Sequence, residues 1–224
     1  MKRIFTLFTA LVMLLGLVVS AHAILYNRGT DTLGNRLIYD DDLGITWYDY
    51  TNGNNTWENQ VNWASALSVT FGGTIYDDWR LPSTVDGPWV PGYDGTTTAG
   101  YNITSSEMGY LFYTELGNLG YYDTSENYVG AGNWGLNNTG DFQNLLPTNY
   151  WSGTEYAADT GYAWGIVFSD GSQSMQLKGG GVYALAVRPG DVSAAVPEPG
   201  TMLLVGSGLA GLAVFRKRFG RIHR

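Results

Sequence analysis

Apolar segments at both ends of the chain leave only its middle for a folded domain, and the C-terminal segment is the more specific of the two. Pro197, Glu198 and Pro199 open it, and the prolines keep the backbone extended because each ring fixes φ and removes an amide donor. An apolar run follows over about residues 200–215, and five Lys or Arg residues come after it. A helix of this length is about 24 Å long, somewhat shorter than the ~30 Å hydrocarbon core of a bilayer. The pattern predicts a short transmembrane helix whose basic end stays in the cytoplasm.

This order of motif, helix and basic end resembles the PEP-CTERM proteins of Gram-negative bacteria that make exopolysaccharide. The resemblance implies that residues 196–224 are a sorting signal, recognised at Pro197, Glu198 and Pro199 and processed by a membrane-embedded exosortase. The protein is then expected in the inner membrane first, held by the C-terminal helix. After processing it is expected on the cell surface or in the extracellular matrix. The alternative is an ordinary C-terminal membrane anchor.

The N-terminal segment has the pattern of a secretory signal peptide. Lys2 and Arg3 precede an apolar stretch, and Ala21 and Ala23 give the small-x-small pattern of a signal peptidase site. We therefore assign residues 1–23 to a cleaved signal peptide and expect the mature chain to begin at Ile24. Signal peptidase and exosortase are the two expected processing partners.

The charge of the chain excludes several classes of ligand. The whole chain has a net charge of −8, but residues 24–195 hold five Lys or Arg against nineteen Asp or Glu, a net charge of about −14. Such a surface repels nucleic acids and polyanionic glycans and favours neutral or cationic partners. The chain has no cysteine, so disulfides, thiol chemistry and thiolate metal sites are excluded. We expect no nucleic-acid partner.

The middle of the chain predicts a single α+β domain over residues 24–190, joined to the sorting signal by a linker at residues 191–195. Period-two and period-3.6 patterns, with turn residues between them, indicate two helices and an antiparallel sheet in which N- and C-terminal strands pair. The expected elements are two strands over 35–47 around an acidic turn at 40–42, a helix from a Thr56 cap to Gly72, a helix with a Thr104/Glu107 capping box that ends near Gly117, a hairpin over 164–178 and a strand over 183–188.

Five short motifs resemble the Lcl C-terminal domain family. They are Gly44-Ile45-Thr46-Trp47, Asp78-Trp79-Arg80-Leu81-Pro82, Ser106-Glu107-Met108-Gly109, Tyr150-Trp151-Ser152-Gly153-Thr154-Glu155-Tyr156 and Ala186-Val187-Arg188-Pro189-Gly190-Asp191. The resemblance implies a fold similar to C-type lectin-like and formylglycine-generating-enzyme-like domains. A relative of this family binds sulfated glycans, but the acidic charge of this chain argues against such a ligand.

The second of these motifs places a charge pair, an indole and a proline in five positions: Asp78, Trp79, Arg80, Leu81 and Pro82. A guanidinium in a domain core needs a carboxylate partner. We therefore expect Arg80 to be a buried structural charge, with ligand binding as the alternative. Glu155 and Arg188 are isolated charges among apolar residues, and we interpret them in the same way.

The side chains available for catalysis or metal binding are few. The two histidines, His22 and His223, lie outside residues 24–195, so neither a Ser-His-Asp triad nor a histidine-bound zinc can form in the domain. A pair of carboxylates leaves glycan hydrolysis open as an alternative. Asp40, Asp41 and Asp42 leave calcium open in the same way. Neighbouring side chains of an extended segment point to opposite sides, which favours a solvated acidic turn and no cofactor.

Aromatic side chains in long loops are the best candidates for ligand contacts, because aromatic rings stack on sugar rings. The candidates are Trp89, Tyr93, Tyr101 and Trp134. Their alternative role is to anchor the loops that carry them. The sequence thus predicts an exported surface or matrix protein with a non-catalytic binding or structural role, associated with neutral exopolysaccharide. A carboxylate-dependent glycan hydrolase is the alternative.

Overall fold

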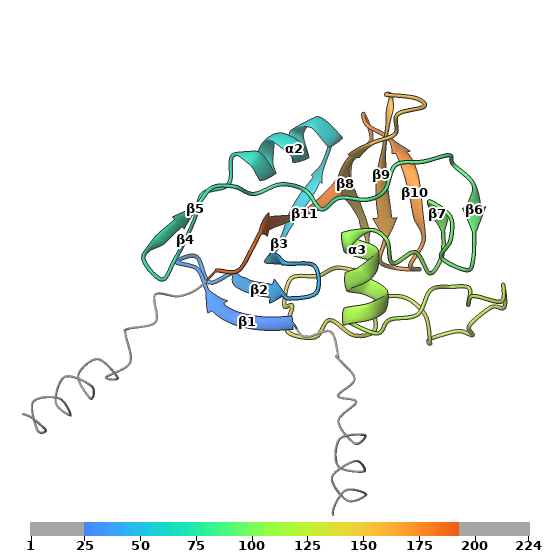
Figure 1. Ribbon diagram of the computed structural model, residues 1–224, viewed down its shortest axis with the longest axis horizontal. Coiled ribbons are helices and arrows are strands. Elements are labelled where there is room, and N and C mark those ends of the chain that lie inside the picture. The colour runs from blue at the N-terminus through green and yellow to red at the C-terminus, as the bar shows by residue number, and fades with distance from the viewer. Residues whose placement is uncertain (1–24, 193–224) are drawn as a thin grey trace, which may run out of the picture.

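The computed structural model describes residues 25–192, which form a large mixed sheet with a few short helices (Figure 1). The strands are β1 (Leu25–Thr30), β2 (Arg36–Asp40), β3 (Ile45–Asn55), β4 (Val69–Phe71), β5 (Thr74–Tyr76), β6 (Pro91–Gly92), β7 (Ala99–Gly100), β8 (Asn149–Glu155), β9 (Tyr162–Val167), β10 (Gln173–Leu177) and β11 (Val182–Pro189). The helices are α2 (Trp57–Ser65) and α3 (Glu107–Tyr110), and α3 continues directly into a π-helical turn, η1 (Leu111–Glu115). This content confirms the α+β class.

The last strand lies in the middle of the sheet and joins its two halves. The strand order is β1-β2-β3-β11-β8-β9-β10-β7-β6, and β4 and β5 form a separate hairpin. Strand β11 pairs with β3 in antiparallel fashion and with β8 in parallel fashion, where Tyr183 lies opposite Tyr150. The predicted pairing of N- and C-terminal strands is therefore confirmed. The predicted acidic turn is confirmed as well, and Gly44 closes it with a φ of 63°.

Two hydrophobic cores lie on opposite faces of this sheet because successive side chains of a strand point to opposite sides. In β2, Ile38 belongs to one core and Leu37 to the other, and both are fully buried. The first core contains Met108, Leu111 and Phe112 of α3 and η1, while the second contains Ala64 of α2. Each helix therefore covers a different face, and Figure 1 shows them well apart.

The first helix is shorter than the sequence predicted. It ends at Ser65, and Val69–Phe71 forms strand β4 with Gly72 in the following turn. Thr56 is the N-cap residue as predicted, with an extended backbone, but its side chain makes no capping hydrogen bond. The β-branched Val69 and Thr70 favour a strand, and pairing with β5 supplies backbone hydrogen bonds that a further helical turn would have used.

The second helix ends near Gly117 as predicted, but its cap differs. The Ser106 hydroxyl accepts the amide hydrogen of Gly109 at 3.0 Å, so Ser106 and not Thr104 is the N-cap. The expected capping box fails because the Glu107 carboxylate is engaged elsewhere, by Arg80. Glu107 thus forms an ion pair with a residue distant in sequence, and it does not form the predicted capping box.

The two ends of the described chain meet at one edge of the domain. Arg28 in β1 donates two hydrogen bonds to the Asp191 carboxylate, at 2.9 and 2.7 Å. Val192 is fully buried in the second core. The folded domain therefore includes Asp191 and Val192, two residues of the predicted linker.

Candidate functional site

The Asp78–Pro82 motif ties a loop to three other elements. The backbone of Arg80 exchanges two hydrogen bonds with Val187 in β11, at 2.9 and 2.8 Å, and the Pro82 carbonyl accepts the Gly153 amide hydrogen at 2.7 Å. Trp79 is buried, and its indole donates to the Tyr76 carbonyl at 3.0 Å. The motif thus holds α3, β8 and β11 together at one junction.

Arg80 has a carboxylate partner at this junction, but it is Glu107 and not the neighbouring Asp78. Its Nη1 and Nη2 atoms donate to the two oxygens of Glu107 at 2.7 Å, and the Ser83 amide donates to the same carboxylate at 2.7 Å. The predicted full burial of Arg80 is wrong, since 42% of its side chain is exposed. The hydrogen bonds that Arg80 donates to Glu107, together with the negative charge of that carboxylate, raise the pKa of Arg80.

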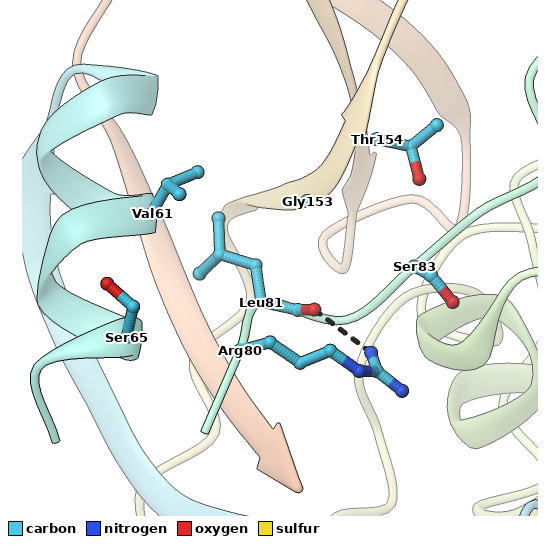
Figure 2. Close-up of a pocket in the computed structure, with 7 residues that line it drawn as sticks. All are labelled: Val61, Ser65, Arg80, Leu81, Ser83, Gly153 and Thr154. Atoms are coloured by element: carbon cyan, nitrogen blue, oxygen red, sulfur yellow. Dashed lines mark hydrogen bonds between the residues drawn. The ribbon is translucent and has the colours of Figure 1, made fainter. Parts of the chain in front are cut away.

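A hollow of about 420 Å³ opens beside this ion pair (Figure 2). Val61 and Ser65 of α2 form one wall, Gly153 and Thr154 of β8 form another, and Arg80, Leu81 and Ser83 complete it. Figure 2 shows the guanidinium directed toward the Leu81 carbonyl, to which it donates at 3.1 Å. Because Glu107 already neutralises Arg80 and no carboxylate lines the hollow, it offers neither a free charge nor a pair of acids.

A second surface brings together six aromatic rings from loops that are distant in sequence. Tyr93 and Tyr101 stack with their ring centroids 6.0 Å apart, and both meet the edge of Tyr122, at 5.1 and 5.3 Å. Tyr121 extends this row, with its ring centroid 4.8 Å from Tyr122 and 4.8 Å from Tyr128. Trp134 lies at the far end, 5.0 Å from Tyr121. We call these six residues the aromatic row.

A hollow of about 470 Å³ adjoins the aromatic row. Its lining combines apolar and polar groups: Asn102, Leu119, Gly120, Tyr122, Asp123, Thr124, Tyr128 and Val129. Tyr122 and Tyr128 form an antiparallel bridge, so the segment between them is a tight hairpin. Asp123 closes this hairpin by accepting the amide hydrogens of Asn127 and Ser125, at 2.9 and 2.8 Å. These bonds, the one from Asn127 first, hold the pKa of Asp123 below its ordinary value.

The stretch of chain that carries the aromatic row has charges of one sign. No Lys, Arg or His occurs between Arg80 and Lys178, whereas this stretch carries Asp94, Asp123, Glu126 and Asp170 among its acids. Burial, followed by the charge of Asp170, raises the pKa of Tyr101 to about 12. Its phenol is therefore a neutral hydrogen-bonding group at physiological pH.

The structure brings three of the four predicted aromatic contacts together and separates the fourth. Tyr93, Tyr101 and Trp134 belong to the aromatic row. Trp89 does not: it is 46% exposed, and its indole nitrogen lies 3.4 Å from the Ser174 hydroxyl in β10. The sequence analysis missed Tyr121, Tyr122, Tyr128 and Asn102. The signal was present, because tyrosines flank a polar Asp-Thr-Ser-Glu-Asn turn on both sides.

The acidic turn separates its three carboxylates. Asp40 is fully buried and accepts the Leu43 amide hydrogen at 2.9 Å, while Asp41 and Asp42 are exposed. Asp42 accepts the Tyr110 hydroxyl hydrogen at 2.9 Å. Within residues 25–192, no three side chains of His, Cys, Asp or Glu lie close enough together to hold a metal ion.

Glu115, at the end of η1, is a titratable group that sequence reasoning missed. Both of its carboxylate oxygens are buried, and among the described residues neither has a hydrogen-bond partner. Burial, followed by the negative charges of Asp40, Asp42 and Asp41, raises the pKa of Glu115 to about 7.

Two other predicted charges have partners. Arg188 in β11 donates to Asp78 at 2.8 and 3.1 Å, and these bonds lower the pKa of Asp78. Glu155 in β8 pairs with Lys178, which also lies over the ring of Trp57, 4.1 Å from its centroid. Both charges therefore contribute to the packing of the sheet.

The remaining predicted sites lie outside the described residues: Ala21, Ala23, Pro197, Glu198 and Pro199. Comparison with known families bears on the last three. Residues 195–218 match the family model of the PEP-CTERM protein-sorting motif. The chain carries a PEP-CTERM sorting signal. Such signals are recognised by exosortase, so the motif implies exosortase-dependent export with a membrane-anchored C-terminal signal.

The match covers the sorting signal and not the domain that precedes it. No curated protein and no solved structure matches the chain. Among residues 25–192 no helix is long and apolar enough to cross a membrane. The role of the domain must therefore be argued from its own surface.

Proposed function

We propose that this protein is an exosortase-sorted component of the cell surface or extracellular matrix of a Gram-negative bacterium, and that its domain binds neutral exopolysaccharide without catalysis or a cofactor. The sorting signal supports the destination. The observation that carries the binding role is the aromatic row beside a hollow, in a stretch of chain without a single basic residue. Aromatic faces and neutral hydroxyl-binding groups suit uncharged sugars, and the surrounding acids disfavour anionic ones.

The fold assignment is part of the same proposal. The five motifs that resemble the Lcl C-terminal domain family support a lectin-like domain. Four of them meet at the Arg80 junction, through Arg80, Glu107, Gly153 and Val187. In this proposal the junction shapes the domain, and the aromatic row binds the ligand. Signal peptidase cleavage after Ala23 and exosortase processing near Pro197 produce the mature form.

The experiment uses the exported protein recovered from the cells that make it. It should sediment with the neutral exopolysaccharide of those cells, and this association should persist in 0.5 M salt because it does not depend on ion pairs. The same mixture is assayed for new reducing ends. Failure to associate with any polysaccharide would contradict the binding role, and steady release of reducing ends would indicate the glycan hydrolase instead.

A further inference from the structure

The hairpin between Tyr122 and Tyr128 combines exposed aromatic faces with polar groups at the rim of one hollow. Tyr128 is 49% exposed, and its ring lies 4.8 Å from that of Tyr121. Trp134 also packs against Tyr121, and its indole nitrogen donates to the Tyr128 hydroxyl at 3.5 Å. Tyr121 therefore supports two neighbouring rings: Tyr128, the exposed ring of the aromatic row, and Trp134, which is half-buried.

Asn102 supplies a hydrogen-bond acceptor to the same hollow. Its side-chain nitrogen donates to the carbonyls of Tyr93 and Tyr122, at 2.6 and 3.1 Å, which fixes the orientation of the amide. Among the described residues no donor bonds to its side-chain oxygen. Asn102 lines the hollow together with Asp123, so an amide oxygen and a carboxylate are available to ligand hydroxyls.

The backbone around this hollow is held in an uncommon conformation. Among residues 25–192, the non-glycine residues with positive φ are Asn102, at 59°, and Glu126, at 64°. Asn102 lines the hollow, and Glu126 lies in the hairpin turn between Asp123 and Tyr128, two other residues of the lining. Strained backbone that surrounding contacts maintain is frequent at binding sites.

We propose that this hairpin is a binding site for an uncharged pyranose unit of a polysaccharide chain. The sugar face stacks on Tyr128 and Trp134, and its hydroxyls donate to Asn102 and Asp123. The proposal rests on the proposed function and adds the place and the selectivity of binding. Selectivity against uronate or sulfated sugars follows from the negative charges of Asp123, which lines the hollow, and of Glu126 in the same turn, in a stretch of chain without any base.

Two aromatic variants test the site, with a third as the matched control. Tyr128→Ala and Trp134→Ala remove the stacking faces, whereas Trp89→Ala removes an indole that is 46% exposed but lies outside the aromatic row. Binding is measured by affinity electrophoresis of the processed protein in gels that contain hydroxyethyl cellulose or the neutral exopolysaccharide of the producing cells. Each site variant should weaken binding about tenfold, and Trp89→Ala should bind as the wild type does. Thermal melting identifies any variant that has lost its fold, and Trp134→Leu, which keeps apolar bulk without a stacking ring, then replaces Trp134→Ala.

A charge variant tests the selectivity. Glu126→Gln removes a carboxylate that has no side-chain partner among the described residues. The wild type should bind hydroxyethyl cellulose but not polygalacturonate, and Glu126→Gln should bind polygalacturonate measurably.

The outcomes separate this inference from the proposed function. If the wild type binds polysaccharide and both site variants bind equally well, the site is wrong but the binding role stands. If Trp89→Ala alone abolishes binding, the site lies on the loop that carries Trp89, and the inference is overturned. If the wild type binds no polysaccharide, the proposed function fails, and this inference fails with it. Equal affinity for polygalacturonate and hydroxyethyl cellulose would overturn the selectivity.

Discussion

At the residue scale, every Lys and Arg of residues 25–192 has an acceptor, whereas one buried carboxylate has no donor among the same residues. Four of the five basic residues in positions 24–195 form ion pairs, and the fifth, Arg36, donates to the Asp141 carbonyl. Glu115 is the carboxylate whose oxygens are both buried and without a hydrogen-bond partner among the described residues. Replacing Arg80, a member of an ion pair, should therefore lower the stability of the domain, whereas replacing the unpaired Glu115 should raise it.

The Arg80–Glu107 pair should stabilise the domain, although less than a fully buried pair does. Arg80→Ala leaves Glu107, which is 15% exposed, with the Ser83 amide but without its cation. Because 42% of the Arg80 side chain is exposed, we expect a loss of about 1–3 kcal/mol in the free energy of unfolding, below the ~3–5 kcal/mol of a buried pair. Urea denaturation measures this loss. Arg80→Ala in a Glu107→Gln background should cost less, and an unchanged midpoint for Arg80→Ala alone would show that the junction does not need the pair.

Glu115 should make the domain less stable as the pH rises toward neutrality. Its folded-state pKa, about 7, lies above the ordinary value of 4.5, so the fold favours the protonated form. Between these two values the unfolded chain loses the proton first, and the free energy of unfolding therefore falls as the pH rises from about 4.5 to about 7.

Glu115→Gln removes this titration and should be more stable than the wild type at pH 8. The observable is the difference between the two stability curves, because the buried carboxylates Asp40 and Asp49 titrate in both proteins. Glu58→Gln, at an exposed position of α2, is the control and should leave the curve unchanged. Parallel curves for wild type and Glu115→Gln would show that Glu115 ionises as it does in the unfolded chain.

At the element scale, α3 is positioned by one glycine. A β-carbon at Gly109 would lie 2.0 Å from the Ile103 carbonyl oxygen, a backbone atom that cannot rotate away. Gly109→Ala raises helix propensity by about 1 kcal/mol, yet it should destabilise the domain, because α3 must shift away from the first core. Gly53→Ala in β3, where nothing lies within 4 Å of the added carbon, is the matched control and should be close to neutral. Thermal melting of both variants tests this prediction. A higher melting temperature for Gly109→Ala would show that the Ile103 carbonyl does not obstruct a side chain at this position.

The elements that could be predicted from the sequence are those that local patterns determine. The strands β2, β3, β9, β10 and β11 follow from alternation and turn residues, and so does the turn at Gly44. What failed depends on contacts between distant segments. Glu107 pairs with Arg80 and not with a helix cap, and Val69 pairs with β5 and does not continue α2. The prediction of the aromatic row from the sequence was incomplete for the same reason, since its rings come from three separate loops.

At the scale of the whole molecule, the fold places the start and the end of the domain side by side. Strand β11 completes the middle of the sheet, and Asp191 binds Arg28 in the first strand. The last strand must therefore be inserted before the sheet is complete. Strand β11 ends at Pro189, and the sorting motif begins at residue 195. Only a few residues therefore separate the central strand of the domain from the signal that anchors the chain in the membrane.

Export and final sorting should be separable by mutation. The predicted N-terminal signal peptide is expected to direct translocation, while the matched sorting motif is the signal that exosortase recognises. Alanine at Pro197, Glu198 and Pro199 should leave translocation intact but keep the protein in the inner membrane with its C-terminal segment attached. Ser193→Ala with Thr201→Ala, on the two sides of the motif, is the control and should be processed normally. Cell fractionation and mass spectrometry of the C-terminus provide the measurements. If the triple variant is still trimmed and reaches the same compartment as the wild type, the three residues are not the recognised motif and the apolar run acts as an ordinary anchor.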